Sequence, residues 1–107
     1  MTEIHSFFFP TTIHFGVGAI NLLRKELSER GCKHPLIVTD RGVLSQPFFQ
    51  TILAQLKELN PVVYSDVHPN PWVSDVVNGT KICREVRADC ILTVGGGSPM
   101  DAAKAIA

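Results

Sequence analysis

Three consecutive glycines near the end of the chain are the residues best suited to chemistry. The stretch Gly95-Gly96-Gly97-Ser98-Pro99-Met100-Asp101 follows a short apolar segment, residues 90–94, and runs into an alanine-rich segment, residues 102–107. This order predicts a strand, a tight turn and the start of a helix. Glycines let a ligand approach the backbone closely, and the unpaired N–H groups of a first helical turn favour an anion. The sequence therefore predicts a binding site for the phosphates of a nucleotide.

The residues after the glycines are typical of a helix start. Ser98 is expected to be the N-cap, Pro99 the first helical residue, and Asp101 the last member of a Ser-x-x-Asp capping pattern. The Gly-x-Gly-x-x-Gly fingerprint of many dinucleotide sites is broken, because Met100 stands where its third glycine belongs. A strand-to-helix turn without a ligand would also explain the pattern. We favour binding, because three glycines exceed what a turn needs and each costs backbone entropy on folding.

Two polar residues are expected at the same edge of the sheet as the glycine turn. Asp40 follows a predicted strand, residues 36–39, and could accept hydrogen bonds from both hydroxyls of an adenosine ribose while repelling the 2′-phosphate of NADP. An aspartate that serves only its own turn is an equally good interpretation. Asn70, held between two prolines, could cap the helix that follows or present its amide to a ligand.

Strands and helices alternate along the chain. Two short strands around a Pro-Thr turn precede a helix over about residues 19–30, and strands at 36–39, 62–64 and 90–94 alternate with helices that begin near Pro47 and Val73. We expect Trp72 to pack at the start of the third helix. The alternation predicts an α/β fold, a Rossmann-like parallel sheet with flanking helices and right-handed crossovers. The residues expected to face the core are Phe48, Phe49, Ile52, Leu53 and Leu56 of the second helix, and Val73, Val76, Val77, Thr80 and Cys83 of the third.

Composition excludes several classes of partner. Ten Lys and Arg residues balance ten Asp and Glu residues, so no basic excess points to nucleic acid or to an anionic membrane. No apolar run is long enough to span a bilayer. The cysteines, Cys32, Cys83 and Cys90, are odd in number and lack Cys-x-x-Cys spacing, so we expect reduced, mostly buried thiols in a cytoplasmic protein. The four histidines show no ligand spacing, and we assign no metal ligand and no catalytic residue to this chain.

The end of the chain is unusual for a complete domain. The sequence stops at Ala107, six residues into a predicted helix that has no C-cap and no strand after it. A helix this short is marginal unless it packs on something else. We therefore expect these 107 residues to be the front part of a longer protein.

Four motifs resemble the iron-containing alcohol dehydrogenase family. They are Phe15-Gly16-Val17-Gly18-Ala19, Leu36-Ile37-Val38-Thr39-Asp40, Pro69-Asn70-Pro71, and the glycine turn continued to Ala102-Ala103-Lys104. They occur in the family's order and span the whole chain, although this is only the first quarter to third of a typical member. The resemblance implies the fold shared by dehydroquinate synthase-like proteins and iron-containing alcohol dehydrogenases. Residues 1–107 would be an incomplete N-terminal dinucleotide-binding domain, and an all-helical, metal-binding C-terminal domain would lie beyond them.

The resemblance also implies a cofactor site and a reaction. Hydride would pass between a small alcohol or aldehyde and NAD, while a divalent iron polarises the alcohol oxygen. The iron ligands, an Asp and three His in the family, would lie beyond Ala107, and a homodimer is expected because the first strands commonly take part in dimer contacts in similar proteins. The residues implied in NAD binding are Asp40 at the adenosine ribose, Asn70 near the cofactor, and Gly96, Gly97, Ser98, Met100 and Asp101 around the diphosphate and nicotinamide, with Gly95 and Pro99 of the same turn.

Other functions are compatible with parts of this pattern. Glycerol dehydrogenases resemble this chain but usually place Lys where Ser98 stands, and dehydroquinate synthases have a different series after the glycines. Ser98 therefore favours the alcohol dehydrogenase branch, and Asp40 resembles the NAD-using members. An isolated nucleotide-binding fragment without catalysis is the literal interpretation of 107 residues, and we expect the chain by itself to be inactive.

Overall fold

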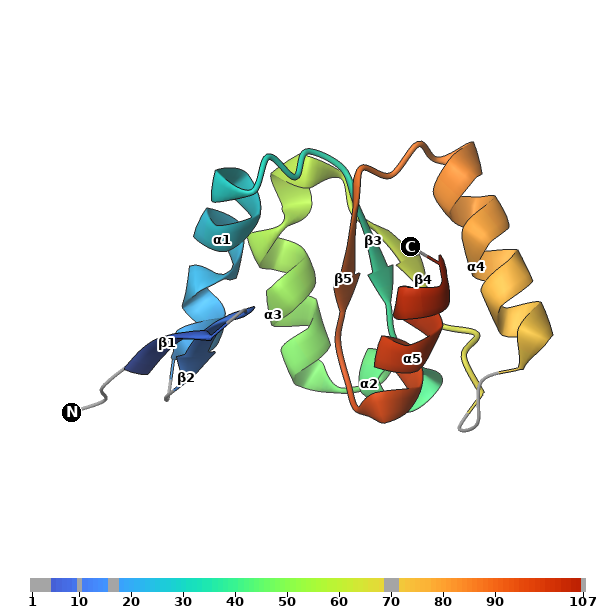
Figure 1. Cartoon of the computed structure of the whole chain (residues 1–107), viewed down its shortest axis with the longest axis horizontal. Helices are drawn as coiled ribbons and strands as arrows, with labels where there is room; N and C mark the ends of the chain where they lie inside the picture. Colours follow the sequence, from blue (N-terminus) through green and yellow to red (C-terminus); the bar gives the residue numbers. More distant parts are fainter. Residues whose placement is uncertain (1–4, 10, 16–17, 69–71, 107) are drawn as a thin grey trace. The chain divides into compact units, whose positions relative to one another are not determined.

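A computed structural model describes residues 5–9, 11–15, 18–68 and 72–106, which fall into two units, Met1–Gly31 and Cys32–Ala107 (Figure 1). In the first unit, strands β1 (His5–Phe9) and β2 (Thr11–Phe15) pair antiparallel along their whole length. This confirms the two strands expected around the Pro-Thr turn. A 3-10 turn, η1 (Ala19–Leu22), leads into α1 (Leu23–Glu29), within the span predicted to be helical.

A parallel sheet of three strands forms the centre of the second unit. Its strands are β3 (Pro35–Val38), β4 (Val62–Tyr64) and β5 (Cys90–Thr93), in the order β4-β3-β5. All four residues of β3 are buried, as expected for a central strand covered on both faces. The strand order places the first strand of this unit between the other two, so the carboxyl ends of β3 and β5 are adjacent.

Helices cover both faces of this sheet (Figure 1). The connection from β3 to β4 contains the short helix α2 (Arg41–Leu44), α3 (Pro47–Gln55) and the 3-10 turn η2 (Lys57–Leu59). Helix α4 (Val73–Glu85) connects β4 to β5, and α5 (Gly97–Ile106) follows β5. In Figure 1, α3 lies on one side of the strands and α4 and α5 on the other. The predicted Rossmann-like α/β arrangement is confirmed. No helix among the described residues has the length and apolar character needed to cross a membrane.

The main core lies between the sheet, α4 and α5. Leu36 and Val38 of β3 share this core with small and branched side chains of α5, and Ile37 points to the other face because side chains alternate along a strand. Gly79 of α4 allows the two helices to approach closely, since a Cβ at this position would overlap the side chain of Ile106. The buried members of this core are Leu36, Val38, Tyr64, Val67, Ala102, Ala103 and Ile106.

The predicted inner faces of two helices are partly wrong. Helix α3 buries Phe49 and Ile52, but Phe48 is exposed. Helix α4 buries Asp75 and Gly79, while Val73 and Val77 are exposed. The hydrophobic pattern is misleading in α4 because a polar side chain, Asp75, is buried by its hydrogen bonds and a glycine makes the closest helix contact. Val76, Thr80 and Cys83 are partly buried, in agreement with the prediction.

The prediction of three reduced thiols is wrong for two of the cysteines. Cys32 and Cys90 form a disulfide with their Cα atoms 5.8 Å apart, whereas Cys83 is free and partly buried. Cys90 is the first residue of β5, and Cys32 lies just before β3, the neighbouring strand. Their sequence separation of 58 hides this proximity, because the proximity depends on the order of strands in the sheet.

Candidate nucleotide-binding site

Thr39 joins the carboxyl ends of the three parallel strands. Its backbone N–H donates to the Tyr64 carbonyl at the end of β4 (2.9 Å), and its hydroxyl donates to the Val94 carbonyl after β5 (2.7 Å). The Thr39 side chain is fully buried, so water does not compete for these bonds. They fix the relative positions of the next residues along two strands, Asp40 and Gly95.

Asp40 caps α2 and lies against the glycine turn. Its backbone is extended, and its Oδ1 accepts a hydrogen bond from the Val43 N–H at 2.8 Å. The other carboxylate oxygen, Oδ2, lies 3.6 Å from the position that a Cβ on Gly95 would occupy. Among the described residues, only Val43 donates to this carboxylate. The interpretation of Asp40 as a turn residue is therefore correct for Oδ1, while Oδ2 stays available at the place where β3 and β5 end.

Gly95 and Gly96 are glycines for different reasons. Gly95 has a φ of 131°, which residues with a side chain rarely adopt, and a Cβ there would lie 3.3 Å from both Pro99 Cγ and Val43 Cγ2. The fold itself therefore requires glycine at position 95. Gly96 does not have a positive φ, and among the described atoms a Cβ there would meet none within 4 Å. The space beside Gly96 is open to a ligand.

Helix α5 begins earlier than the sequence predicts. It starts at Gly97, so Ser98 lies in its first turn and is not the N-cap, and Pro99 is the third helical residue. Proline fits this position because the N–H groups of a first turn have no partner within the helix. Pro99 is buried, whereas Met100 is exposed. For Gly97, Ser98 and Asp101 the structure describes the backbone only.

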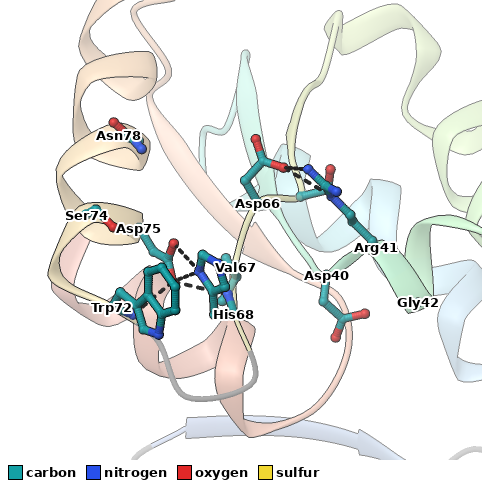
Figure 2. Close-up of a pocket in the computed structure, with 11 residues that line it drawn as sticks. Asp40, Arg41, Gly42, Asp66, Val67, His68, Trp72, Ser74, Asp75 and Asn78 are labelled. Carbon is teal, nitrogen blue, oxygen red and sulfur yellow. Dashed lines mark hydrogen bonds and ion pairs between the residues drawn. The ribbon is translucent and has the colours of Figure 1, made fainter.

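Asp40 also lines a cavity of about 660 Å³ (Figure 2). Its lining residues follow β3 (residues 40–42), follow β4 (residues 65–68), or belong to the start of α4. Gly95 and Gly96 are not among the lining residues. Asp40 therefore contacts both features: it lines the cavity and it lies against the glycine turn.

One wall of the cavity is built by His68, Trp72 and Asp75 (Figure 2). The His68 ring stacks on the Trp72 ring with centroids 3.7 Å apart, and His68 Nδ1 lies 2.8 Å from Asp75 Oδ1. Asp75 Oδ2 accepts hydrogen bonds from the backbone N–H groups of Trp72 (2.8 Å) and His68 (3.1 Å). Trp72 therefore packs on His68 at the start of α4, as predicted, although the residue is 58% exposed. The hydrogen bond from the backbone N–H of Trp72 to the Asp75 carboxylate holds Trp72 at the N-cap of α4, and the indole ring stays on the surface.

These contacts set the charge state of Asp75. Burial by itself raises the pKa of Asp75, but the hydrogen bonds from Trp72 and His68 outweigh that effect and hold the pKa below its usual value. Burial, together with Asp75 and Asp66 nearby, raises the pKa of Tyr64. The Tyr64 hydroxyl donates to the Asp75 carbonyl at 2.7 Å and ties the start of α4 to β4.

Acidic groups dominate the cavity near Asp40. Arg41 is neutralised by Asp66, with Nη2 2.7 Å from Oδ1, as Figure 2 shows. Both side chains are exposed, so the ion pair contributes little to stability. Asp40 and Asp75 have no Lys or Arg partner among the described residues. A phosphate group inside the cavity would therefore be repelled by the charges of Asp40 and Asp75.

Two predictions remain, one on the role of Asn70 and one on metal ligands, and neither concerns the residues around Asp40. Asn70 lies outside the described residues, so its role stays a prediction, and the N-cap of α4 is Trp72. Among the described residues, Cys32, Asp89 and Cys90 form the one group of three potential metal ligands, with ligand atoms within 4.8 Å of one another. This group lies at the amino ends of β3 and β5, away from Asp40, and its two sulfur atoms are joined in the disulfide and are not thiolate ligands. The described residues do not fit the Asp and His set expected for iron.

Local sequence patterns point only weakly to several of the residues that position this site. Thr39 was assigned only to a strand, although a hydroxyl at the end of an apolar run is a signal for a hydrogen bond between strands. Asp75 stands at the third position of a helix, where a carboxylate can bond back to the N-cap N–H. No local signal identifies His68, because its place depends on the loop between β4 and α4.

Known proteins share this sequence and this fold. The sequence model of the family described as iron-containing alcohol dehydrogenase matches residues 10–107. NADH-dependent butanol dehydrogenase B from Clostridium acetobutylicum is 40% identical over 92% of this chain, which covers 26% of that protein. The structure of NADH-dependent butanol dehydrogenase A from Thermotoga maritima superposes with a TM-score of 0.79 and 29% identity, covering 85% of this chain and 24% of that one.

Another solved structure with this fold was determined with a bound nucleotide. Sulfoacetaldehyde reductase from Bifidobacterium kashiwanohense, determined in complex with NAD+, has a TM-score of 0.79 and 26% identity, covering 84% of this chain and 24% of that one. The chain thus spans about a quarter of the length of these relatives. The match of the family's sequence model to nearly the whole chain, with this agreement in fold, shows that the chain belongs to the iron-containing alcohol dehydrogenase family.

Proposed function

We propose that this chain provides the dinucleotide cradle of an NAD-dependent, iron-containing alcohol dehydrogenase. The diphosphate of NAD would lie over Gly95, Gly96 and Gly97 at the amino end of α5, and the adenosine ribose would lie at Asp40. Asn70, Ser98, Pro99, Met100 and Asp101 would complete the cofactor site. The site spans the carboxyl ends of β3 and β5, the edge at which open parallel sheets bind their ligands.

The open space beside Gly96 is the observation that carries this proposal. A glycine costs backbone entropy, and neither conformation nor packing among the described residues demands one at this position. Close approach of a ligand to the backbone would explain why position 96 is a glycine. The helix start adjacent to it supplies N–H groups and a partial positive charge, which together favour a phosphate.

Asp40 supports NAD as the cofactor rather than NADP. Its Oδ1 is held by the Val43 N–H, so the carboxylate keeps one orientation while Oδ2 can accept from ribose hydroxyls. A 2′-phosphate would meet this negative charge, and Arg41 would have to leave Asp66 to balance it. Both effects favour NAD.

The reaction follows from family membership rather than from groups in this chain. We propose hydride transfer between NAD and a small alcohol or aldehyde, as the name butanol dehydrogenase indicates for the relatives. Iron, when bound, would act as a Lewis acid on the alcohol oxygen, and its ligands are not among the described residues. We also propose a cytoplasmic homodimer.

Cofactor titration of this chain tests the proposal. Calorimetry should show that the chain binds NAD+ at least about tenfold more tightly than NADP+, a difference of about 1.4 kcal/mol. Asp40→Asn keeps an oxygen that can cap α2 but removes the charge. It should therefore narrow the difference in affinity between NAD+ and NADP+, mainly by improving NADP+ binding. Glu85→Gln is the matched control, because it removes one exposed negative charge from α4 at a residue that does not line the cavity. Equal affinities of the wild-type chain for NAD+ and NADP+ would show that Asp40 does not contact the adenosine ribose. An Asp40→Asn variant with the same ratio of the two affinities as the wild-type chain would show the same.

A further inference from the structure

The disulfide partners lie at the edge of the sheet opposite the proposed cofactor site. Cys90 begins β5 and pairs in register with Pro35 of β3, and Cys32 lies three residues before that strand. Strand β5 runs from Cys90 to Thr93, about 10 Å at the rise of an extended strand, and Val94 lies between its end and Gly95. Chemistry at the two cysteines is therefore separated from the glycine turn by the length of the strand.

Asp89 holds the two cysteine segments together independently of the sulfur–sulfur bond. Its carboxylate accepts the backbone N–H groups of Lys33 and His34, both at 2.8 Å, and its own N–H donates to the His34 carbonyl at 3.0 Å. These bonds lower the pKa of Asp89, so the carboxylate stays charged near neutral pH. Cys32 Sγ lies 3.8 Å from Asp89 Oδ1, where a reduced thiol has an acceptor for its proton. The reduced pair is thus kept within reach of closure.

From this geometry we propose that Cys32 and Cys90 are a reversible thiol–disulfide site, which exchanges with low-molecular-weight disulfides such as oxidised glutathione. The two residues differ in exposure: Cys32 is 5% exposed, and Cys90 is more exposed. Cys90 is therefore the residue that meets the reagent, and Cys32 is the residue that closes the bond.

The exchange proceeds in two balanced steps. The Cys90 thiolate attacks one sulfur of the reagent disulfide, forms a mixed disulfide and releases one reagent thiol. The Cys32 thiolate then attacks the Cys90 sulfur, closes the protein disulfide and releases the second reagent thiol. The two cysteines lose two electrons and two protons, and the reagent disulfide gains them as two thiols. Excess thiol reverses both steps.

Closure should stabilise the second unit and leave nucleotide binding unchanged. The bond closes a loop of 58 residues, which restricts the unfolded chain strongly. For a chain of this size we expect the melting temperature to rise by at least about 10 °C on oxidation. Affinity for NAD+ should change by less than about twofold, because the pair and the glycine turn lie at opposite ends of β5.

A glutathione redox titration of the full chain tests this site, in a Cys83→Ser background that removes the third thiol. Mixtures of oxidised and reduced glutathione are equilibrated with the protein, and free thiols are then alkylated and counted by intact mass. We expect a reversible change between two free thiols and none, with constant far-ultraviolet circular dichroism. Two free thiols in folded protein at every ratio, or reduction only after unfolding, would overturn the proposal.

Single variants test the order of the two steps. In Cys32→Ser, a glutathione adduct should accumulate at Cys90, because nothing displaces it. In Cys90→Ser, Cys32 should stay unmodified while the protein is folded. Equal modification of Cys32 in the folded protein would overturn the assigned roles, and equal melting temperatures of the oxidised and reduced forms would overturn the stabilising effect.

Discussion

Gly96→Ala separates the role of the glycine turn in binding from its role in folding. The added Cβ would meet none of the described atoms within 4 Å, and the backbone at Gly96 does not have a positive φ. The folded state should accept alanine, and the less flexible unfolded chain should make the variant more stable by about 0.4–1 kcal/mol. In the proposed complex, the same methyl group stands where a phosphate oxygen approaches the backbone.

The expected loss of affinity follows from that approach. Displacing the diphosphate removes at least one hydrogen bond to a charged group, which is worth about 1.5–3 kcal/mol. The dissociation constant for NAD+ should therefore rise about 10- to 150-fold. Gly95→Ala is the matched comparison, because its φ of 131° and its contacts with Pro99 and Val43 predict a loss of folding stability of about 1–3 kcal/mol.

Urea unfolding and calorimetry with NAD+ on both variants give the two quantities. We predict that Gly96→Ala folds at least as stably as the wild-type chain and binds NAD+ weakly. Normal NAD+ affinity in a folded Gly96→Ala protein would refute the cradle. A large loss of stability in Gly96→Ala would show that glycine 96 serves the fold, and the argument from open space would then be wrong.

Three further substitutions test the supporting structure. Gly79→Ala should lower the free energy of unfolding by about 1–3 kcal/mol, because its Cβ would overlap Ile106 between α4 and α5. Thr39→Val should cost about 1–3 kcal/mol in urea unfolding, since it leaves the Val94 carbonyl without its donor, and it should also weaken NAD+ binding. The pKa of Asp75 is lowered in the folded state, so its stabilising effect is complete above the unfolded value of about 3.9 and is lost as the pH falls through the lower folded value. Unfolding measured at several pH values should therefore show a weaker loss of stability in acid for Asp75→Asn.

Each substitution has a control in the same region. Asn78→Ala changes the neighbouring, exposed residue of α4 and should be nearly neutral, so an equal effect of both α4 variants would contradict the contact with α5. Thr39→Ser keeps the hydroxyl and should retain most of the NAD+ affinity. Asp66→Asn, at an exposed site, should leave the acid dependence unchanged. If the free energy of unfolding of Asp75→Asn falls in acid as much as that of the wild-type chain, Asp75 is not the cause of the loss of stability.

The sheet and its connections could be predicted because they depend on local patterns. Continuous apolar runs identified β3, β4 and β5, and Pro47 marked the first residue of α3. The glycine turn and Asp40 were also found locally, and their positions at adjacent strand ends followed from the rule for parallel sheets. Whether these residues bind NAD stays a prediction.

Contacts between distant segments could not be predicted in the same way. The proximity of Cys32 and Cys90 depends on β3 lying next to β5, and the sequence does not state the strand order. The inner face of α4 was misjudged because hydrogen bonds, rather than hydrophobicity, bury Asp75. Helix α5 begins two residues before the predicted start, because Pro99 fits any position of a first turn, where its missing N–H has no partner in the helix, and so does not mark the first residue.

A crystal structure of the chain with bound NAD+ tests the central claim most directly. We predict the diphosphate within hydrogen-bonding distance of the backbone N–H groups of Gly96 and Gly97, and the adenosine ribose hydroxyls on the Asp40 carboxylate. A nucleotide bound elsewhere, with those N–H groups donating to carbonyls of the protein itself, would contradict the account.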